Sequence, residues 1–168
     1  LPRDAGRAYA INGTKSVGKP RGAGIIFILT FTLASVLFIP LSPELIIYLI
    51  LVLAAMLSGY LDDSSKAPWG NLKKGLIDLA IAVMGAVTYL RFNPNTFELA
   101  LSDKIITLHP VIYGILIVIL IWASINVTNC SDGVDGLCGT LSVVTLISTY
   151  VLFKSYEIEP YYRHVLLI

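Results

Sequence analysis

Hydrophobic residues gather in five long stretches along this sequence, and short polar segments separate them. A membrane-spanning helix needs about 20 mostly apolar residues. Backbone polar groups must be paired within the segment in lipid, which favours helices. The pattern therefore predicts an all-α, polytopic transmembrane helical bundle in one integral membrane domain, residues 1–168. The five full spans are expected at residues 23–41, 45–61, 75–90, 110–125 and 136–153, and a further span is expected to start at residues 165–168.

Composition supports a membrane protein and excludes other classes. Residues of the AVILMFWYC set make up 56% of the chain and charged residues only 14%, whereas soluble domains carry about 25% charged residues. The formal net charge of +1 provides no general attraction to nucleic acid, so we expect no nucleic-acid partner. Cys130 and Cys138 are the two cysteines of the sequence, and their spacing matches neither a disulfide framework nor a zinc site.

Basic residues predict the orientation of the bundle in the membrane. Five spans divide the polar segments into two alternating sets, and one set carries eight of the twelve Lys and Arg residues. Cytoplasmic loops are the ones enriched in Lys and Arg. The predicted cytoplasmic loops are therefore residues 1–22, 62–74 and 126–135.

A short β-hairpin is expected on the opposite, extracytoplasmic side. Residues 96–101 and 105–108 flank a turn at Ser102, Asp103 and Lys104, and the first arm alternates apolar and polar residues as strands do. An irregular loop is the alternative.

Adjacent carboxylates form the first candidate site. Asp62 and Asp63 lie at the cytoplasmic end of a predicted span, and Lys66 follows three residues later. Repulsion between neighbouring carboxylates near the membrane edge either raises the pKa of one of them or is relieved by a divalent cation. Either outcome suits phosphate chemistry, but a solvated acidic helix end is an equally simple interpretation.

A polar loop at residues 126–136 is the second candidate. Asp132-Gly133 and Asp135-Gly136 place two carboxylates three residues apart, and the glycines allow backbone amides to approach a ligand closely. The alternative is a tight turn that caps the following helix. We favour a ligand-binding role because a simple connector needs far fewer Asn and Asp residues.

The third candidate is the basic, glycine-rich segment at residues 15–24, which includes Lys15, Lys19 and Arg21. Such a segment can bind an anion through its side chains and through the free amides of a helix N-terminus. Basic segments next to spans also act as topology anchors or contact lipid headgroups. By itself this segment favours the latter interpretation.

These segments, in this order, resemble the polyprenyl-phosphate N-acetylhexosamine-1-phosphate transferases, and within them the phospho-N-acetylmuramoyl-pentapeptide transferases. Asp62, Asp63 and Lys66 match the D-D-x-x-K motif of the family. The N-x-x-N-x-[TS]-D-G-x-D-G motif is matched by Asn126, Asn129, Ser131, Asp132, Gly133, Asp135 and Gly136. Ser131 suits the muramoyl branch, whereas residues 18–24 depart from the P-T-M-G-G sequence that is usual in that branch.

The resemblance implies Mg²⁺-dependent transfer of phospho-N-acetylmuramoyl-pentapeptide from UDP to undecaprenyl phosphate, giving lipid I and UMP. It implies Asp62 as the base supported by Asp63, and Asp132 as a third catalytic residue. Asn129 and Asp132 would contact the metal. The implied substrate-binding residues are Lys15, Lys66, Lys74 (or Lys73 in its place), Asn126, Gly133 and Asp135.

The resemblance also implies that the chain is part of a larger ten-helix protein of the bacterial plasma membrane, acting on its cytoplasmic face as a homodimer. We expect the first helix, a later Asp and a His-rich loop to be missing, so this piece alone should be inactive.

Two other functions remain alternatives. A polyprenyl-phosphate N-acetylglucosamine-1-phosphate transferase would share nearly every residue of these motifs. An ion-coupled transporter should instead carry its carboxylates at mid-membrane, whereas Asp62, Asp63, Asp132 and Asp135 all lie at predicted span ends. A purely structural membrane protein is no more favoured than a transporter.

Overall fold

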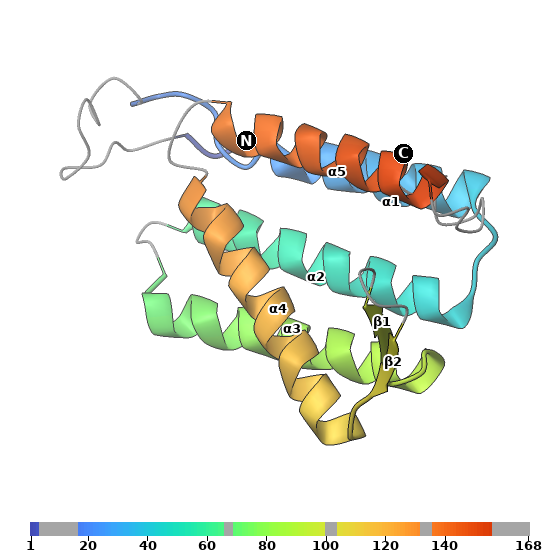
Figure 1. Ribbon diagram of the computed structural model, residues 1–168. Helices are drawn as coiled ribbons and strands as arrows, with labels where there is room; N and C mark the ends of the chain where they lie inside the picture. Colours follow the sequence, from blue (N-terminus) through green and yellow to red (C-terminus); the bar gives the residue numbers. More distant parts are fainter. Residues whose placement is uncertain (4–16, 66–68, 100–103, 132–135, 156–168) are drawn as a thin grey trace.

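Five helices and one β-hairpin form the chain in a computed structural model, which describes residues 1–3, 17–65, 69–99, 104–131 and 136–155 (Figure 1). The predicted helical bundle with a small hairpin is confirmed. In chain order the elements are α1 (Gly24–Phe38), α2 (Pro43–Ser64), α3 (Asn71–Phe92), β1 (Thr96–Leu99), β2 (Lys104–Thr107), α4 (Pro110–Ser131) and α5 (Leu137–Ser155).

Within the described residues, four helices, α2 to α5, are long and apolar enough to cross a membrane. Helix α1 has 15 residues and spans about 22 Å at 1.5 Å per residue, less than the stretch expected at residues 23–41. Its end has a local cause. Ile39 is extended, with φ −116° and ψ 135°, because Pro40 follows it and proline disfavours helical geometry in the residue before it.

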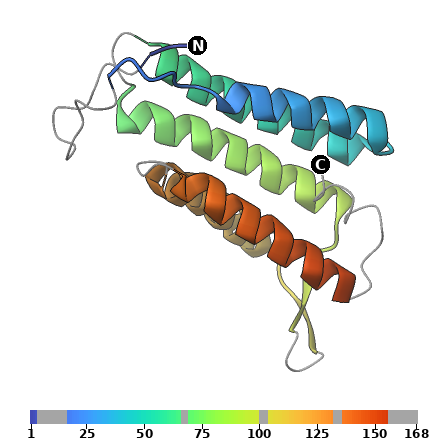
Figure 2. The ribbon, with the colours of Figure 1, turned by 90° about the horizontal axis from the view of Figure 1, so that it is seen from above.

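The helices pack in the order α1, α2, α3, α4, and α5 contacts α4. Figure 2 shows α5 beside α4 and away from α1, on the other side of α3. The central helix α3 buries small residues, including Ala82, Gly85 and Ala86. A Cβ atom on Gly85 would lie 3.2 Å from Ile121 Cδ1. Small residues therefore let α3 and α4 approach closely, as in other membrane helix pairs.

Both views place the start of α1, the end of α2, the start of α3, the end of α4 and the start of α5 at one end of the bundle (Figures 1 and 2). This is the end that the basic residues predict to be cytoplasmic. The hairpin lies at the opposite end, as its predicted side requires. The candidate segments therefore meet at one end.

The predicted hairpin is confirmed, and its second arm lies one residue earlier than expected. β1 and β2 are antiparallel, with Thr96 opposite Thr107. Lys104 was expected in the turn but begins β2. The ring of Phe97 stacks on Tyr113 of α4 with a centroid distance of 6.4 Å. This aromatic contact attaches the hairpin to the bundle.

Near the hairpin, a polar cluster joins the start of α2 to the end of α3. Glu44 Oε1 accepts hydrogen bonds from Tyr48 Oη at 3.1 Å and from Asn93 Nδ2 at 2.6 Å. The side chain of Ser42 caps α2 by accepting a hydrogen bond from the Leu45 N–H at 3.1 Å. These contacts fix how α2 and α3 pair at the end away from the candidate site.

Helices α2, α3 and α4 extend into the segments predicted as loops at residues 62–74 and 126–135. Asp62 and Asp63 lie in the last turn of α2, Lys74 in the first turns of α3, and Asn126 and Asn129 in the last turns of α4. For α2 and α4 the difference arises because residues 60–67 and 115–132 contain no Gly or Pro, so no helix breaker ends these helices earlier.

Candidate functional site

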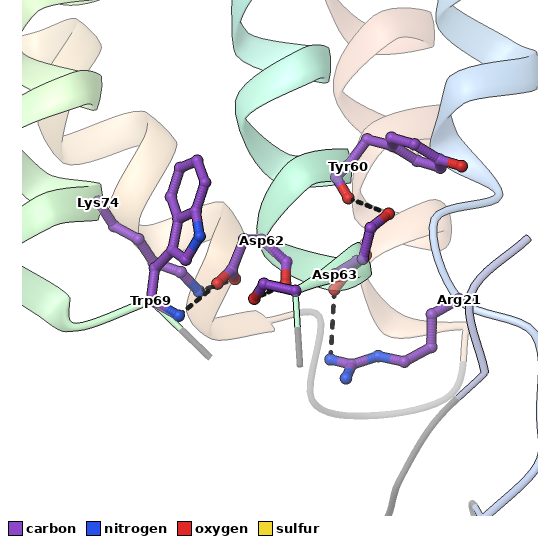
Figure 3. A network of polar contacts seen from close by, with 8 residues as sticks. Arg21, Tyr60, Asp62, Asp63, Trp69 and Lys74 are labelled. Carbon is purple, nitrogen blue, oxygen red and sulfur yellow. Dashed lines mark hydrogen bonds and ion pairs between the residues drawn. The ribbon is translucent and has the colours of Figure 1, made fainter. Parts of the chain in front are cut away.

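Asp62 is held by two groups from the start of α3 and the residues before it (Figure 3). Its Oδ2 forms an ion pair with Lys74 Nζ. Its Oδ1 accepts a hydrogen bond from the Trp69 backbone N–H at 2.7 Å. Only 13% of the Asp62 side chain is exposed, and a carboxylate this buried requires such partners.

Asp63 has a different cation. Its Oδ1 lies 3.3 Å from Arg21 Nη2, and about 30% of each side chain is exposed. Figure 3 shows Asp62 directed toward Trp69 and Lys74, and Asp63 directed toward Arg21 on the other side of α2. The adjacent carboxylates therefore point to different sides of α2, and each is paired with its own cation.

Serine side chains contact backbone carbonyl groups at the end of α2. The Ser65 N–H and hydroxyl both donate to the Asp62 carbonyl oxygen, at 3.1 and 2.7 Å. The Ser64 hydroxyl donates to the Tyr60 carbonyl oxygen at 2.7 Å. Serine hydroxyls thus add hydrogen bonds to carbonyl groups in the last turn of the helix.

The segment before α1 rests on α2 through Gly22. Gly22 has φ +71°, a left-handed conformation that only glycine adopts easily. A Cβ atom there would lie 3.1 Å from Tyr60 Cδ2. The Arg21 N–H also donates to the Pro2 carbonyl oxygen at 2.8 Å, and Arg3 pairs with Pro20 in an antiparallel bridge. This packing brings Arg21 to the last turn of α2.

The two neighbouring lysines at the start of α3 differ in their contacts. Lys73 Nζ lies 3.5 Å from the centroid of the Trp69 ring, a cation–π contact. Lys74 pairs with Asp62. The sequence left Lys73 and Lys74 as alternative substrate-binding residues. In the structure Lys74 is the one that lies beside Asp62.

The end of α4 is attached to the start of α3. Trp122 Nε1 donates a hydrogen bond to the Gly75 carbonyl oxygen at 3.1 Å, one residue after Lys74. Asn126 lies one turn further along α4, and its Nδ2 donates to the Trp122 carbonyl oxygen at 2.8 Å. Asn129 is exposed. Asn126 and Asn129 therefore lie on the last turns of α4, at the same end of the bundle as Asp62.

A cavity of about 460 Å³ lies between the start of α1 and the second half of α2. Asp63, Tyr60 and Gly22 line its polar part, and Ile28 and Met56 contribute to its apolar part. One end of this cavity is thus charged and the other is apolar.

The structure brings together Asp62, Asp63 and Lys74 among the predicted site residues, and it adds two partners that the sequence did not indicate. These are Arg21, noted in the sequence only as one cation of a basic segment, and the backbone of Trp69.

Five predicted residues lie outside the described ranges: Lys15, Lys66, Asp132, Gly133 and Asp135. In the part of the chain that the structure describes, no three His, Cys, Asp or Glu side chains could hold a metal ion together.

Comparison with known proteins identifies related sequences. The family model described as "Glycosyl transferase family 4" matches residues 45–168. The phospho-N-acetylmuramoyl-pentapeptide-transferase of Treponema pallidum (strain Nichols) is 38% identical over 159 residues, which cover 91% of this chain and 43% of the relative. Proteins of the same name from Symbiobacterium thermophilum and Clostridium acetobutylicum are 32% and 31% identical over 143 and 158 residues.

These last two alignments cover 76% and 89% of this chain, and 42% and 49% of the relatives. The chain thus spans less than half the length of the curated relatives it matches. No solved structure matches the chain significantly. The sequence matches confirm the resemblance to these transferases that the motifs indicated.

Proposed function

The chain belongs to glycosyl transferase family 4, and from this premise we propose that it forms part of a membrane-embedded phospho-N-acetylmuramoyl-pentapeptide transferase. In this reaction a phosphate oxygen of undecaprenyl phosphate attacks the phosphorus next to the sugar of the UDP-linked donor. The bond to UMP breaks, and the products are lipid I and UMP. The names of the relatives support phospho-N-acetylmuramoyl-pentapeptide as the transferred group.

One observation carries the proposal: the Asp62–Lys74 pair at the end of α2, beside the Asp63–Arg21 pair. The two substrates both carry phosphate, so they repel one another unless cations lie close to the meeting point. Catalysis of phosphoryl transfer depends mainly on positioning and on offsetting this charge. A carboxylate next to these cations can keep the lipid phosphate deprotonated.

In the proposed reaction Lys74 passes from Asp62 to the incoming phosphate. The Lys74 ammonium beside Asp62 Oδ2 stabilises the ionised carboxylate, so Asp62 accepts a proton more readily once Lys74 leaves it. A phosphate group is a strong acceptor and competes for the Lys74 ammonium. Binding of the lipid phosphate would thus release Asp62 as the base, with Asp63 supporting it.

The remaining proposed contacts use residues of the predicted loops. Lys66 would bind phosphate beside Lys74, and Asp135 and the Gly133 backbone would bind the nucleoside. Lys15 and Asn126 complete the proposed substrate contacts. Asn126 now donates to its own helix, but its carboxamide oxygen is a further acceptor.

Magnesium fits the donor set at the end of α4. Carboxylate and carbonyl oxygens are the protein ligands that Mg²⁺ takes, and we propose Asn129 and Asp132 for this role. The exposed Asn129 lies on the helix that Trp122 attaches beside Lys74. Bound Mg²⁺ would neutralise part of the phosphate charge.

The proposed reaction takes place on the cytoplasmic face of the bacterial plasma membrane. Five of the eight Lys and Arg residues of the predicted cytoplasmic set are described in the structure, namely Arg3, Lys19, Arg21, Lys73 and Lys74. All five lie near the Asp62 end of the bundle, where the positive-inside rule expects them.

The experiment is a transfer assay with the full-length protein that contains this chain, in detergent with polyprenyl phosphate and Mg²⁺. UDP-N-acetylmuramoyl-pentapeptide and UDP-N-acetylglucosamine are offered in turn, and the lipid-linked product and UMP are measured. We expect product from the muramoyl donor. Product from UDP-N-acetylglucosamine alone would reject the muramoyl assignment and support a polyprenyl-phosphate N-acetylglucosamine-1-phosphate transferase. The departure of residues 18–24 from the muramoyl motif would agree with that result.

A further inference from the structure

Arg21 forms an ion pair with Asp63, the second of the two adjacent carboxylates. Asp62 faces α3, where Lys74 and the Trp69 N–H occupy its oxygens. Asp63 faces the segment before α1, where Arg21 lies 3.3 Å away (Figure 3). Arg21 precedes the part of the chain that the family model matches, residues 45–168.

The backbone around Arg21 is fixed independently of this ion pair. Its own N–H is hydrogen-bonded to Pro2, and the next residue, Gly22, packs its left-handed turn against the Tyr60 ring. Tyr60 lies three residues before Asp63 on α2, so the two contacts are on nearby positions of the same helix. A cation on a docked segment of this kind loses less entropy on pairing than one on a free surface chain.

Asp63 has space to adopt other orientations. It lines the cavity of about 460 Å³ between α1 and α2, so the packing around it leaves room for rotation. Without a cation on this side, the Asp63 carboxylate would be free to approach Lys74, which Asp62 now uses. Competition between neighbouring carboxylates for one cation would disturb the geometry of both.

We propose that Arg21 is a positioning residue of the transfer site, which holds the Asp63 carboxylate on the α1 side of α2 and leaves Lys74 to Asp62. This inference rests on the proposed transferase function. Arg21 acts through Asp63 and does not touch the reacting phosphates. Its removal therefore slows the chemical step without weakening the binding of the UDP-linked donor.

The test compares three variants of the full-length protein: Arg21→Gln, Arg21→Lys and Arg3→Gln. For each variant, kcat, KM for the UDP-linked donor and the thermal unfolding midpoint are measured. Arg3 is a matched control because it lies on the strand-like segment that pairs with Pro20 and its side chain is exposed. We expect Arg21→Gln to lower kcat by about 10-fold to 100-fold, the scale of a misplaced catalytic group, with KM and the unfolding midpoint near the wild-type values. Arg21→Lys should recover most of the loss, and Arg3→Gln should behave as wild type.

Several results would overturn the inference. Equal activity of Arg21→Gln and Arg3→Gln would show that the ion pair is not used. A raised KM with unchanged kcat would make Arg21 a donor-binding residue, and a lower unfolding midpoint without rescue by Lys would make it a support of the fold. If the wild-type enzyme is active and a variant gives any of these results, only the proposed role of Arg21 is rejected. A wild-type protein that transfers neither sugar rejects the proposed function and this inference with it.

Discussion

The indole Nε1 of Trp122 donates a hydrogen bond to the carbonyl oxygen of Gly75 across 3.1 Å. These residues are 47 positions apart in the sequence, and the bond joins the second half of α4 to the start of α3. Gly75 follows Lys74 directly, so the bond attaches α4 beside the lysine that pairs with Asp62. The position of Asn126 and Asn129 relative to the acidic pair therefore depends on this contact.

Replacing Trp122 with Phe should weaken the attachment of α4. Phe keeps most of the ring but cannot donate the hydrogen bond, so we expect a loss of about 0.5–1.5 kcal/mol in the free energy of unfolding. Unfolding in detergent measures it, and the transfer assay reports any displacement of α4. Trp69→Phe is the matched control, because Trp69 holds Asp62 through its backbone N–H. Equal stability of the two variants would contradict a role for the indole bond.

Replacing Asp62 with Asn should abolish transfer while leaving the bundle folded. Asn can still accept the hydrogen bond from the Trp69 N–H, but it cannot take a proton or hold the Lys74 ammonium as an ion pair. A lost general base costs at least about 100-fold in rate. We expect the same result for Asp132→Asn. The assay is kcat of the full-length protein, with circular dichroism to confirm folding.

Glu44→Gln is the control for these variants. Glu44 lies at the opposite end of α2, and a Gln there still accepts hydrogen bonds from Tyr48 and Asn93. Activity near the wild-type value in Glu44→Gln, with loss in Asp62→Asn, would locate the chemistry at the predicted cytoplasmic end. Retained activity in both Asp62→Asn and Asp132→Asn would remove these carboxylates from the mechanism.

Periodicity and charge were sufficient to predict the bundle, the hairpin and the end at which the candidate residues meet. The reason is physical: a span must be apolar over its whole length, so its centre is visible in composition alone. The ends were predicted less well. Asn126 and Asn129 were expected in a loop, but their backbone continues α4, since polar residues at the membrane surface are compatible with either state.

Pairing across the site could not be predicted from the sequence. Lys73 and Lys74 are equivalent in the sequence, but in the structure Lys73 contacts the ring of Trp69 and Lys74 pairs with Asp62. Arg21 and Asp63 are 42 positions apart, and no local pattern links them. Such contacts depend on how the helices pack, which the sequence pattern does not specify.

A further prediction concerns the polar cluster near the hairpin. Asn93→Ala removes the 2.6 Å hydrogen bond to Glu44 Oε1 and leaves Tyr48 as the partner of that oxygen. Hydrogen bonds to charged groups are worth about 1.5–3 kcal/mol, so we expect a loss of stability within that range. Thermal and denaturant unfolding in detergent provide the measurement.

The control for Asn93→Ala is Asn71→Ala, the same change on an exposed residue in the first turn of α3. It should leave stability close to the wild-type value. Transfer activity should be little changed in Asn93→Ala because the cluster is remote from Asp62. Two variants of equal stability would mean that Glu44 does not join α2 to α3.

Gly22→Ala should disturb the packing that brings Arg21 to Asp63. Alanine at φ +71° costs about 1–2 kcal/mol in backbone strain, and its Cβ would lie 3.1 Å from Tyr60 Cδ2, so the ring or the segment must move. We expect a lower unfolding midpoint and slower transfer, measured together on the full-length protein. Gly24→Ala is the matched control, because a Cβ at Gly24 meets nothing within 4 Å and alanine favours the helix that begins there. If Gly22→Ala were as active and as stable as Gly24→Ala, the contact with Tyr60 would not be what positions Arg21.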